Sequence, residues 1–299
     1  MQFGAVFPTS DIGSDPGAVR DFAQGVEALG LTRLVTYDHV LGAEHADREP
    51  KLWGPYTEHD AFHEPFVLFG YLAACTRTIE LEVGVLVLPQ RQTALVAKQA
   101  AEVAVLSGGR LRLGIGTGWN WVEYDSLGTE FGTRGARMTE QVEVLRRLWA
   151  EPVVTFEGRF HRIERAGILP RPATTVPIWF GGGAEIQLKR AARLGDGFVA
   201  GNAGERARNS VARLRELLAE NGRDVAQFGF EGLADWSTGP DAVAETARAW
   251  HDAGGTHLSI RTFDTSSAFM GVAPLGYTSV DQHLAAIEQF RDLMVDALA

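Results

Sequence analysis

The feature that most constrains the fold is a strict alternation of strand-like and helix-like segments along the whole chain. Apolar, β-branched runs predict strands at 2–9, 31–40, 79–89, 110–118, 177–183, 196–202, 228–236 and 257–263. Amphipathic or apolar stretches predict helices at 16–29, 63–76, 93–108, 135–150, 184–195, 205–222, 240–255 and 279–299. Because a helix follows each strand, the pattern predicts parallel strands joined by right-handed helical crossovers.

Eight such units in 299 residues fit an α/β fold of the (β/α)8 type, the TIM barrel. An open, doubly wound sheet is the alternative. The barrel is favoured because the eighth helix runs to the last residue of the sequence, so no segment remains outside the eight strand–helix units. No linker rich in Gly, Ser or Pro divides the sequence, so we expect residues 1–299 to form a single domain.

Two segments depart from the repeat. Residues 41–62 form a long polar and aromatic loop after the second strand, and residues 152–164 alternate like a β-hairpin with Glu157 and Gly158 at its turn. Loops after the strand ends build barrel active sites, so 41–62 is a candidate wall or lid. The hairpin lies between the fourth helix and the fifth strand, where it could decorate the bottom face.

Composition limits the partners and the compartment. The net charge of −10 disfavours nucleic-acid binding, which needs a basic face against phosphates. No apolar segment approaches the ~18 residues of a membrane span, and the N-terminus lacks the pattern of a secretory signal peptide. The one cysteine, Cys75, cannot form an internal disulfide, which fits a reducing compartment. We therefore expect a cytoplasmic protein that binds neither nucleic acid nor membrane.

In a barrel the carboxyl ends of the strands meet in one crater, which holds the active site. The candidates at these ends include Phe7, Asp38, His39, Thr117, Trp119, Asn202, Trp236 and Arg261. His39 is the candidate acid–base group, because an imidazole exchanges protons near neutral pH. Successive strand residues point to opposite sides, so only one of Asp38 and His39 is expected inside unless the strand ends there. A histidine that merely caps a loop is the alternative.

Two glycine clusters also lie at these strand ends. Gly114, Gly116 and Gly118 alternate along the fourth strand and do not match the G-x-G-x-x-G fingerprint of dinucleotide-binding folds. They leave room either for a planar ring above the barrel core or for tight packing inside the barrel. The turn at 181–183 precedes a helix, where backbone N–H groups attract phosphate. A plain flexible turn is the alternative.

The residues that most suggest a metal site are His59, Asp60 and His63. They lie in a loop followed by Pro65, and no H-x-H pattern supplies a third ligand. We therefore expect no metal. The G-x-S-x-G elbow of hydrolases is also missing from the sequence.

Six motifs follow one another along the chain: GLTRLVTYDHV, GVLVLPQRQTALVAKQAAEVAVLSGGRLRLGIGTGW, RGAR with VEVLRRLW, FEGRFHRI, PIWFGGG and AARLGDGF. In this order they resemble the bacterial luciferase-like monooxygenase superfamily, particularly its branch of oxidoreductases that use F420, a deazaflavin. The resemblance covers residues 1–202 closely and the remainder loosely. It implies a barrel that binds a flavin-type ring at its carboxyl face, and it distinguishes F420 from FMN poorly.

The resemblance also implies roles for particular residues. In similar proteins a non-prolyl cis peptide bulges from the third strand beneath the ring, and the matching bond joins Gly84 and Val85. Positions that match Asp38, His39, Thr117 and Gly118 bind the ring and ribityl chain, and the turn of Gly181, Gly182 and Gly183 binds the phosphate. The glycines of the fourth strand would then make space for the face of the cofactor.

One departure bears on the substrate. Sugar-phosphate dehydrogenases of this branch carry a Glu after the Thr-Gly of the fourth strand, where this chain has Trp119. That difference argues against a sugar-6-phosphate. Trp119, beside the cofactor, and Trp53 predict an apolar or aromatic substrate pocket, with Phe7 and Trp236 as further walls.

The leading hypothesis is an oxidoreductase that uses F420 to transfer a hydride to or from a small organic substrate, with His39 as proton donor or acceptor. One alternative is a monooxygenase that uses FMNH2 supplied by a separate cofactor-reducing enzyme. A non-catalytic flavin-binding barrel and a metal-dependent barrel hydrolase are the others. The helix at 63–76 is apolar nearly all round, which predicts a homodimer.

Overall fold

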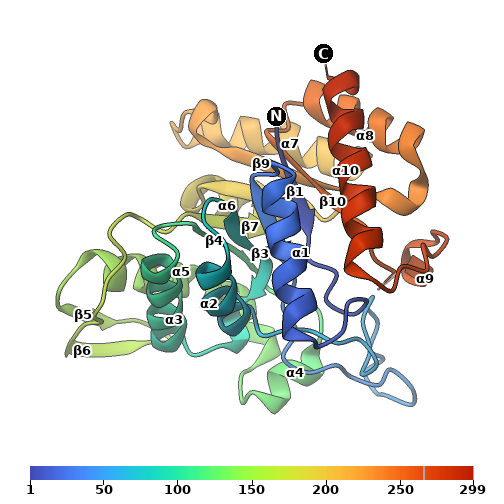
Figure 1. Ribbon diagram of the computed structural model, residues 1–299. Coiled ribbons are helices and arrows are strands. Elements are labelled where there is room, and N and C mark those ends of the chain that lie inside the picture. Colours follow the sequence, from blue (N-terminus) through green and yellow to red (C-terminus); the bar gives the residue numbers. More distant parts are fainter. Residues whose placement is uncertain (265–266, 299) are drawn as a thin grey trace.

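The computed structural model describes residues 1–264 and 267–298, and it shows a closed barrel of eight parallel strands (Figure 1). Around the barrel the strands follow the order β1, β10, β9, β8, β7, β4, β3, β2. Their bounds are β1 (Gln2–Val6), β2 (Arg33–Thr36), β3 (Glu80–Val87), β4 (Leu111–Gly116), β7 (Ile178–Gly181), β8 (Gly197–Val199), β9 (Gly229–Asp235) and β10 (His257–Arg261). Each strand pairs with its neighbours in the chain, and β1 closes against β10. The TIM barrel expected from the sequence is confirmed.

A long helix follows each strand of the barrel. These helices are α1 (Pro16–Ala28), α2 (Pro65–Cys75), α3 (Thr93–Leu106), α5 (Arg134–Ala150), α6 (Glu185–Leu194), α7 (Glu205–Glu220), α8 (Pro240–Asp252) and α10 (Val280–Ala297). Local signals explain their starts: the Asp15 carboxylate accepts from the backbone N–H groups of Gly17 and Ala18, and Pro16 occupies the first turn. Among the described residues, no helix is both long and apolar enough to cross a membrane.

The two expected insertions are present. Residues 41–62 form neither helix nor strand. The hairpin consists of β5 (Val154–Glu157) and β6 (Arg162–Ala166), which pair antiparallel and project from the side of the barrel (Figure 1). His161, beside the hairpin turn, contacts Glu140 of α5 through Nδ1 at 2.7 Å and Thr93 of α3 through Nε2 at 2.6 Å.

Short helical segments were not expected. They are α4 (Trp121–Ser126), α9 (Ser267–Met270) and the 3-10 turns η1 (Leu88–Gln90), η2 (Phe131–Thr133), η3 (Val225–Gln227) and η4 (Trp236–Thr238). Each is six residues or shorter, which is too short to show a helical period in the sequence. Figure 1 places α4 and the 41–62 loop at the same end of the barrel. The sequence therefore failed to predict a helix that lies near the candidate site.

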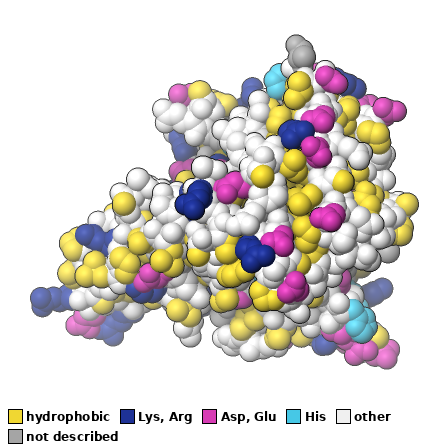
Figure 2. All heavy atoms as spheres, viewed as in Figure 1, with side chains coloured by type: hydrophobic (Ala, Val, Ile, Leu, Met, Phe, Trp, Pro, Cys, Tyr) yellow, Lys and Arg dark blue, Asp and Glu magenta, His cyan; other side chains and the backbone are white. Residues whose placement is uncertain are grey.

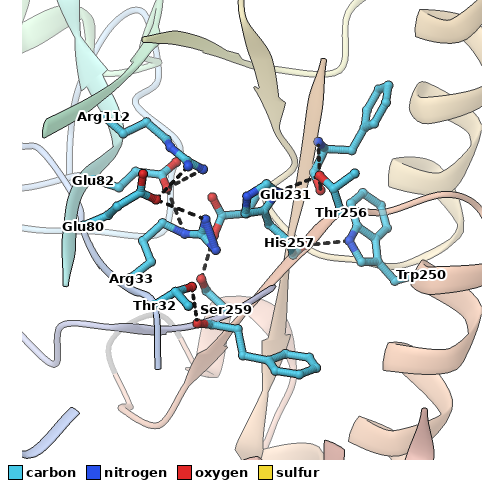
Figure 3. Close-up of polar contacts among 12 residues, drawn as sticks. Thr32, Arg33, Glu80, Glu82, Arg112, Glu231, Trp250, Thr256, His257 and Ser259 are labelled. Atoms are coloured by element: carbon cyan, nitrogen blue, oxygen red, sulfur yellow. Dashed lines mark hydrogen bonds and ion pairs between the residues drawn. The ribbon is translucent and has the colours of Figure 1, made fainter. Parts of the chain in front are cut away.

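The lower half of the barrel interior is ionic rather than apolar (Figure 3). Arg33, Glu82 and Glu231 are all fully buried there. Arg33 Nε lies 3.2 Å from Glu82 and 3.3 Å from Glu231, and the Ser259 hydroxyl donates to Glu231 at 2.6 Å. Arg112 pairs with Glu80 at 2.7 Å. Buried charges persist only when they are paired in this way.

The two buried carboxyl groups differ in protonation. Burial and the adjacent Glu231 raise the pKa of Glu82 well above its usual range. Burial alone would raise the pKa of Glu231, but Arg33 outweighs it, so that pKa is lowered. The cluster therefore favours the proton on Glu82 and the charge on Glu231. Burial, Arg33 and Arg112 lower the pKa of His257 to about 3, so this imidazole adds no charge.

An apolar layer separates this cluster from the mouth of the barrel. Val6, Val35, Leu233 and Phe263 pack together there, with Tyr37 against them. The candidate site lies above this layer, at the carboxyl ends of the strands.

Candidate active site

A cavity of about 410 Å³ opens at the mouth of the barrel. Of the residues expected in the site, Asp38, His39, Gly84, Val85, Gly118 and Trp119 line it. Most of its remaining lining residues are aromatic or apolar, namely Tyr37, Pro55, Tyr56, Val87, Leu233 and Phe269. The cavity can therefore accept a flat, largely apolar group.

Asp38 and His39 both lie beyond the end of β2 and both line the cavity, but their side chains have different partners. β2 ends at Thr36, and the Asp38 carboxylate is fully buried, where it accepts from the Val87 backbone N–H at 2.8 Å and from Arg91 at 2.6 Å. Asp38 thus holds the turn after β3, and its carboxylate is not free to bind a cofactor. The His39 ring lies in the cavity wall.

Aromatic rings surround His39 on several sides. Its ring centroid lies 5.2 Å from that of Tyr56, 5.1 Å from Phe62 and 5.6 Å from Trp119. Trp119 also packs against Gly54, where any added Cβ would lie 2.3 Å from its ring. The 41–62 loop is therefore a wall of the cavity, as expected of an insertion after a strand end.

The peptide bond between Gly84 and Val85 is cis, as expected, and it lies at a bulge in β3. Val83 pairs with Leu113 and Leu86 with Ile115, so two residues of β3 face one of β4. Because of this extra residue, the Val85 side chain is directed toward the glycines of the neighbouring strands.

The glycines of β4 make room for this bulge rather than for a ligand. A Cβ on Gly114 would lie 2.1 Å from the Val83 carbonyl oxygen, and one on Gly116 would lie 2.5 Å from Val85 Cγ2. Gly181 is similar, since its Cβ would lie 2.8 Å from Val85 Cγ1. For Gly114 and Gly116 these contacts favour the tight-packing alternative, whereas Gly118 lines the cavity. Gly114, Gly116 and Gly181 thus pack against the bulge at Gly84 and Val85, which lines the cavity.

Replacing Gly114 with alanine is expected to destabilise the protein and to displace the Gly84–Val85 bulge. The added Cβ would overlap a backbone oxygen, which cannot rotate away. Urea denaturation should show a lower free energy of unfolding. The matched control is Gly70→Ala on α2, where an added Cβ meets no atom within 4 Å and helix propensity should raise stability by about 0.5–1 kcal/mol. Equal effects of the two substitutions would contradict this role of Gly114.

A second cavity of about 460 Å³ adjoins the first, and Gly201 and Asn202 line both. Its wall includes Gly182, Gly183, Arg206 and Ser210. Helix α7 begins here at Glu205 with Gly204 as its N-cap and no side-chain cap. A phosphate group would fit here. It could accept hydrogen bonds from the uncapped N-terminus of α7, from Arg206 and from the backbone of the glycine turn.

Four expected site residues lie elsewhere. Val6 faces the barrel interior, so alternation turns Phe7 outward, where it packs on Phe22 of α1 at 5.5 Å between centroids and does not line the cavity. Trp236 is buried in the apolar core. Thr117 does not line the cavity either, because its hydroxyl accepts from Gln187 and its carbonyl from Tyr124.

Trp53 is the fourth. It is 70% exposed and stacks on Phe269 at 4.7 Å between centroids, so it lies at the rim and not in the wall.

His59, Asp60 and His63 do not form a metal-binding cluster in the part of the chain that the structure describes. His59 is exposed beside Glu58, Asp60 accepts from the Thr57 backbone N–H, and His63 packs against Phe7. Within residues 1–264 and 267–298, no group of three or more His, Cys, Asp and Glu side chains is arranged to hold a metal ion.

Comparison with known proteins decides the family. The model of the luciferase-like monooxygenase family matches residues 1–271. The chain belongs to this family. An uncharacterised protein of Mycobacterium tuberculosis is 34% identical over 210 residues, which span 67% of this chain and 71% of that protein. The F420-dependent glucose-6-phosphate dehydrogenase of Kribbella flavida is 30% identical over 248 residues, 79% of this chain and 70% of that enzyme.

Solved structures agree on the fold of this luciferase-like oxidoreductase. The monooxygenase RslO1 from Streptomyces bottropensis superposes with a TM-score of 0.79 at 19% identity, and the match covers 100% of both chains. At that identity the likeness concerns the barrel and not the chemistry.

Sequence reasoning missed two residues of this luciferase-like site. Glu123 on α4 contacts His39 Nδ1 through Oε2 at 2.9 Å, and Arg206 on α7 lines the second cavity. Glu123 follows Asn120 by three residues, the spacing of a helix N-cap and its N3 position, which was the available signal. Nothing in the sequence separates Arg206 from the other arginines of α7.

Proposed function

We propose that the chain uses F420 to transfer a hydride to or from a small, apolar or aromatic organic substrate. The observation that carries this proposal is the continuity of the two cavities at Gly201 and Asn202. One cavity has a largely apolar and aromatic wall that includes an imidazole, and the other suits a phosphate. A deazaflavin joins a planar ring to a phosphate through a ribityl chain, and its ring donates or accepts a hydride when bound.

The residues present fit such a cofactor. Gly182 has a φ of 100°, a conformation that exposes backbone at the turn, and the glycine next to it lies beside Arg206 and Ser210. A Cβ on Gly201 would point into open space where the cavities meet. These groups would hold the phosphate end, while the Gly84–Val85 bulge and Gly118 would support the ring.

His39 is the group in the first cavity best suited to exchange a proton. Burial raises the pKa of Tyr37 to about 12, so this phenol stays protonated at neutral pH. Asp38 is engaged by Arg91, and Arg261 pairs with Asp235. His39 keeps its Nε2 without a partner among the residues the structure describes. We assign it the role of proton donor or acceptor to the substrate.

Titration of the purified protein with F420 and, separately, with FMN tests the proposal. F420 should quench tryptophan fluorescence with saturable binding, and Arg206→Ala should weaken that binding by about 10-fold through loss of a charged hydrogen-bond donor. The matched control is Arg291→Ala on α10, which removes an arginine that pairs with Glu288 and Asp292 and does not line either cavity. Tighter binding of FMN would support the monooxygenase alternative, and binding of neither would overturn the proposal.

We also propose a homodimer that pairs through α2 and α3. Val67 of α2 is 72% exposed, and Leu95 and Leu106 of α3 are 51% and 63% exposed. Figure 2 shows hydrophobic side chains at the surface over these helices. Sedimentation equilibrium should give a dimer, which Val67→Asp should dissociate and Val295→Asp, at an equally exposed site on α10, should not. A monomeric parent protein would refute the pairing.

A further inference from the structure

Glu123 is a buried carboxylate for which cofactor binding alone gives no role. It is 1% exposed and occupies the third position of α4. Asn120 caps this helix, because its side-chain oxygen accepts from the backbone N–H groups of Val122 at 3.1 Å and Glu123 at 3.4 Å. The cap fixes the first turn of α4, and with it the direction of the Glu123 side chain toward the segment after β2.

Both oxygens of Glu123 are used there. Oε1 accepts from the backbone N–H of Val40 at 2.6 Å and of Leu41 at 3.1 Å. Oε2 lies 2.9 Å from His39 Nδ1. A carboxylate that already accepts two backbone hydrogen bonds acts as an acceptor, so the hydrogen of the third contact belongs on His39 Nδ1.

The surroundings leave the His39 ring few other orientations. Tyr56, Phe62 and Trp119 pack around it at centroid distances of 5.1 to 5.6 Å. The His39 ring lines the cavity, and with Nδ1 held by Glu123 the other nitrogen, Nε2, is the one available to face it. In a neutral imidazole only one nitrogen carries a proton, so a proton on Nδ1 leaves a lone pair on Nε2.

We propose that Glu123 is the positioning residue that fixes His39 in the tautomer protonated on Nδ1, so that Nε2 faces the substrate as a proton acceptor. The inference about the tautomer stands on geometry alone, and its use in a reaction rests on the proposed function. A carboxylate that orients an imidazole in this way also stabilises the imidazolium that forms when Nε2 takes a proton. Glu123 itself is not among the residues that line the cavity.

Glu123→Gln is the variant that separates orientation from folding. Its amide oxygen can keep the two backbone contacts to Val40 and Leu41, while its NH₂ group faces His39 Nδ1 as a donor. Glutamine should therefore force the proton onto Nε2. Long-range ¹H–¹⁵N spectra of protein labelled at histidine report the tautomer directly, with the His39 ring assigned by its loss in His39→Asn.

The chain offers a matched control at a second, partly buried Glu–His pair. Glu140 Oε1 lies 2.7 Å from His161 Nδ1, and Glu140 also accepts from the backbone N–H groups of Arg159 and Phe160. This pair anchors the hairpin and does not line the cavity at the barrel mouth. Glu140→Gln should alter the His161 ring signals, leave those of His39 unchanged and leave turnover unchanged.

Kinetics supply the second readout. With F420 and a competent substrate, Glu123→Gln should lower kcat by about 10²- to 10⁴-fold with little change in KM or in F420 affinity. A proportional loss of cofactor affinity would instead assign Glu123 a purely structural role and overturn the proposal.

The spectra decide the matter without activity. A parent protein with His39 protonated on Nε2, or a Glu123→Gln variant with an unchanged His39 tautomer, would overturn the proposal. The parent spectrum remains decisive even if the variant does not fold. Failure of F420 to bind would refute the proposed function, and it would leave the tautomer assignment intact because the spectra need no cofactor.

Discussion

Replacing His39 with asparagine is expected to lower turnover by about 10²- to 10⁴-fold, the usual contribution of a positioned proton-transfer group. Asparagine is similar in size and polar, but it cannot exchange a proton near neutral pH. Two titratable neighbours in the wall are poor substitutes for it, since Tyr37 stays protonated and Asp38 is engaged by Arg91. Steady-state kinetics with F420 measure the loss, and fluorescence quenching checks that the cofactor still binds.

The control for this substitution is His251→Asn on α8, whose side chain is 55% exposed and contacts Asp252. Its turnover should equal that of the parent protein. If His39→Asn bound F420 and kept full turnover, the proton would have to pass through another group, and the assignment of His39 would be wrong.

Replacing Arg33 with methionine is expected to lower the free energy of unfolding by about 3–5 kcal/mol, the cost of leaving a buried charge uncompensated. Arg33 is the cation that lies between Glu82 and Glu231 inside the barrel (Figure 3). Urea denaturation followed by tryptophan fluorescence measures the change. The double variant Arg33→Met/Glu231→Leu should recover much of the loss, because it removes both charges.

The pH dependence of this cluster follows from its pKa shifts. Glu231 has a lowered pKa in the folded protein, so its contribution is present above the unfolded pKa and is lost as pH falls through the folded one. Without Arg33, burial would raise the pKa of Glu231, and the sign would reverse. Arg33→Met should therefore lose more stability as pH rises.

Glu82→Gln is the control within the cluster. Glu82 has a raised pKa, so its contribution is present at low pH and is lost as pH rises through the folded pKa. An amide can donate to Glu231 as a protonated acid does. The stability of this variant relative to the parent should therefore increase as pH rises. A relative stability that falls with rising pH would contradict the raised pKa of Glu82.

The barrel could be predicted from the sequence because each of its units carries local signals. Pro16 after Asp15 starts a helix, and runs such as 79–89 have the composition of buried parallel strands. The position of His39 could also be predicted, since it follows a strand that must end at the barrel mouth. The hairpin could be predicted for the same reason, from alternation and a Glu-Gly turn.

The substrate-side residues were harder to predict, and the reason is geometric. Phe7 and Thr117 lie at strand ends as expected, but one residue of register decides whether a side chain faces the cavity or the helices. Trp236 begins the unexpected turn η4, which buries it in the core. A tryptophan suggests an aromatic wall from its type alone, and only its backbone direction shows whether it forms one.

The sequence by itself determined the order of the elements, the closure of eight parallel strands and the placing of an imidazole at their carboxyl ends. These features depend on hydrophobic periodicity, helix caps and turn residues, which act over a few residues of the chain. The tertiary structure alone decided what the glycines are for and which carboxylate orients His39. The Val85 side chain packs against Gly114, Gly116 and Gly181 from other strands, and Glu123 reaches His39 across 84 positions of the chain. Such contacts depend on the bulge in β3 and on the first turn of α4, which form only when the barrel closes.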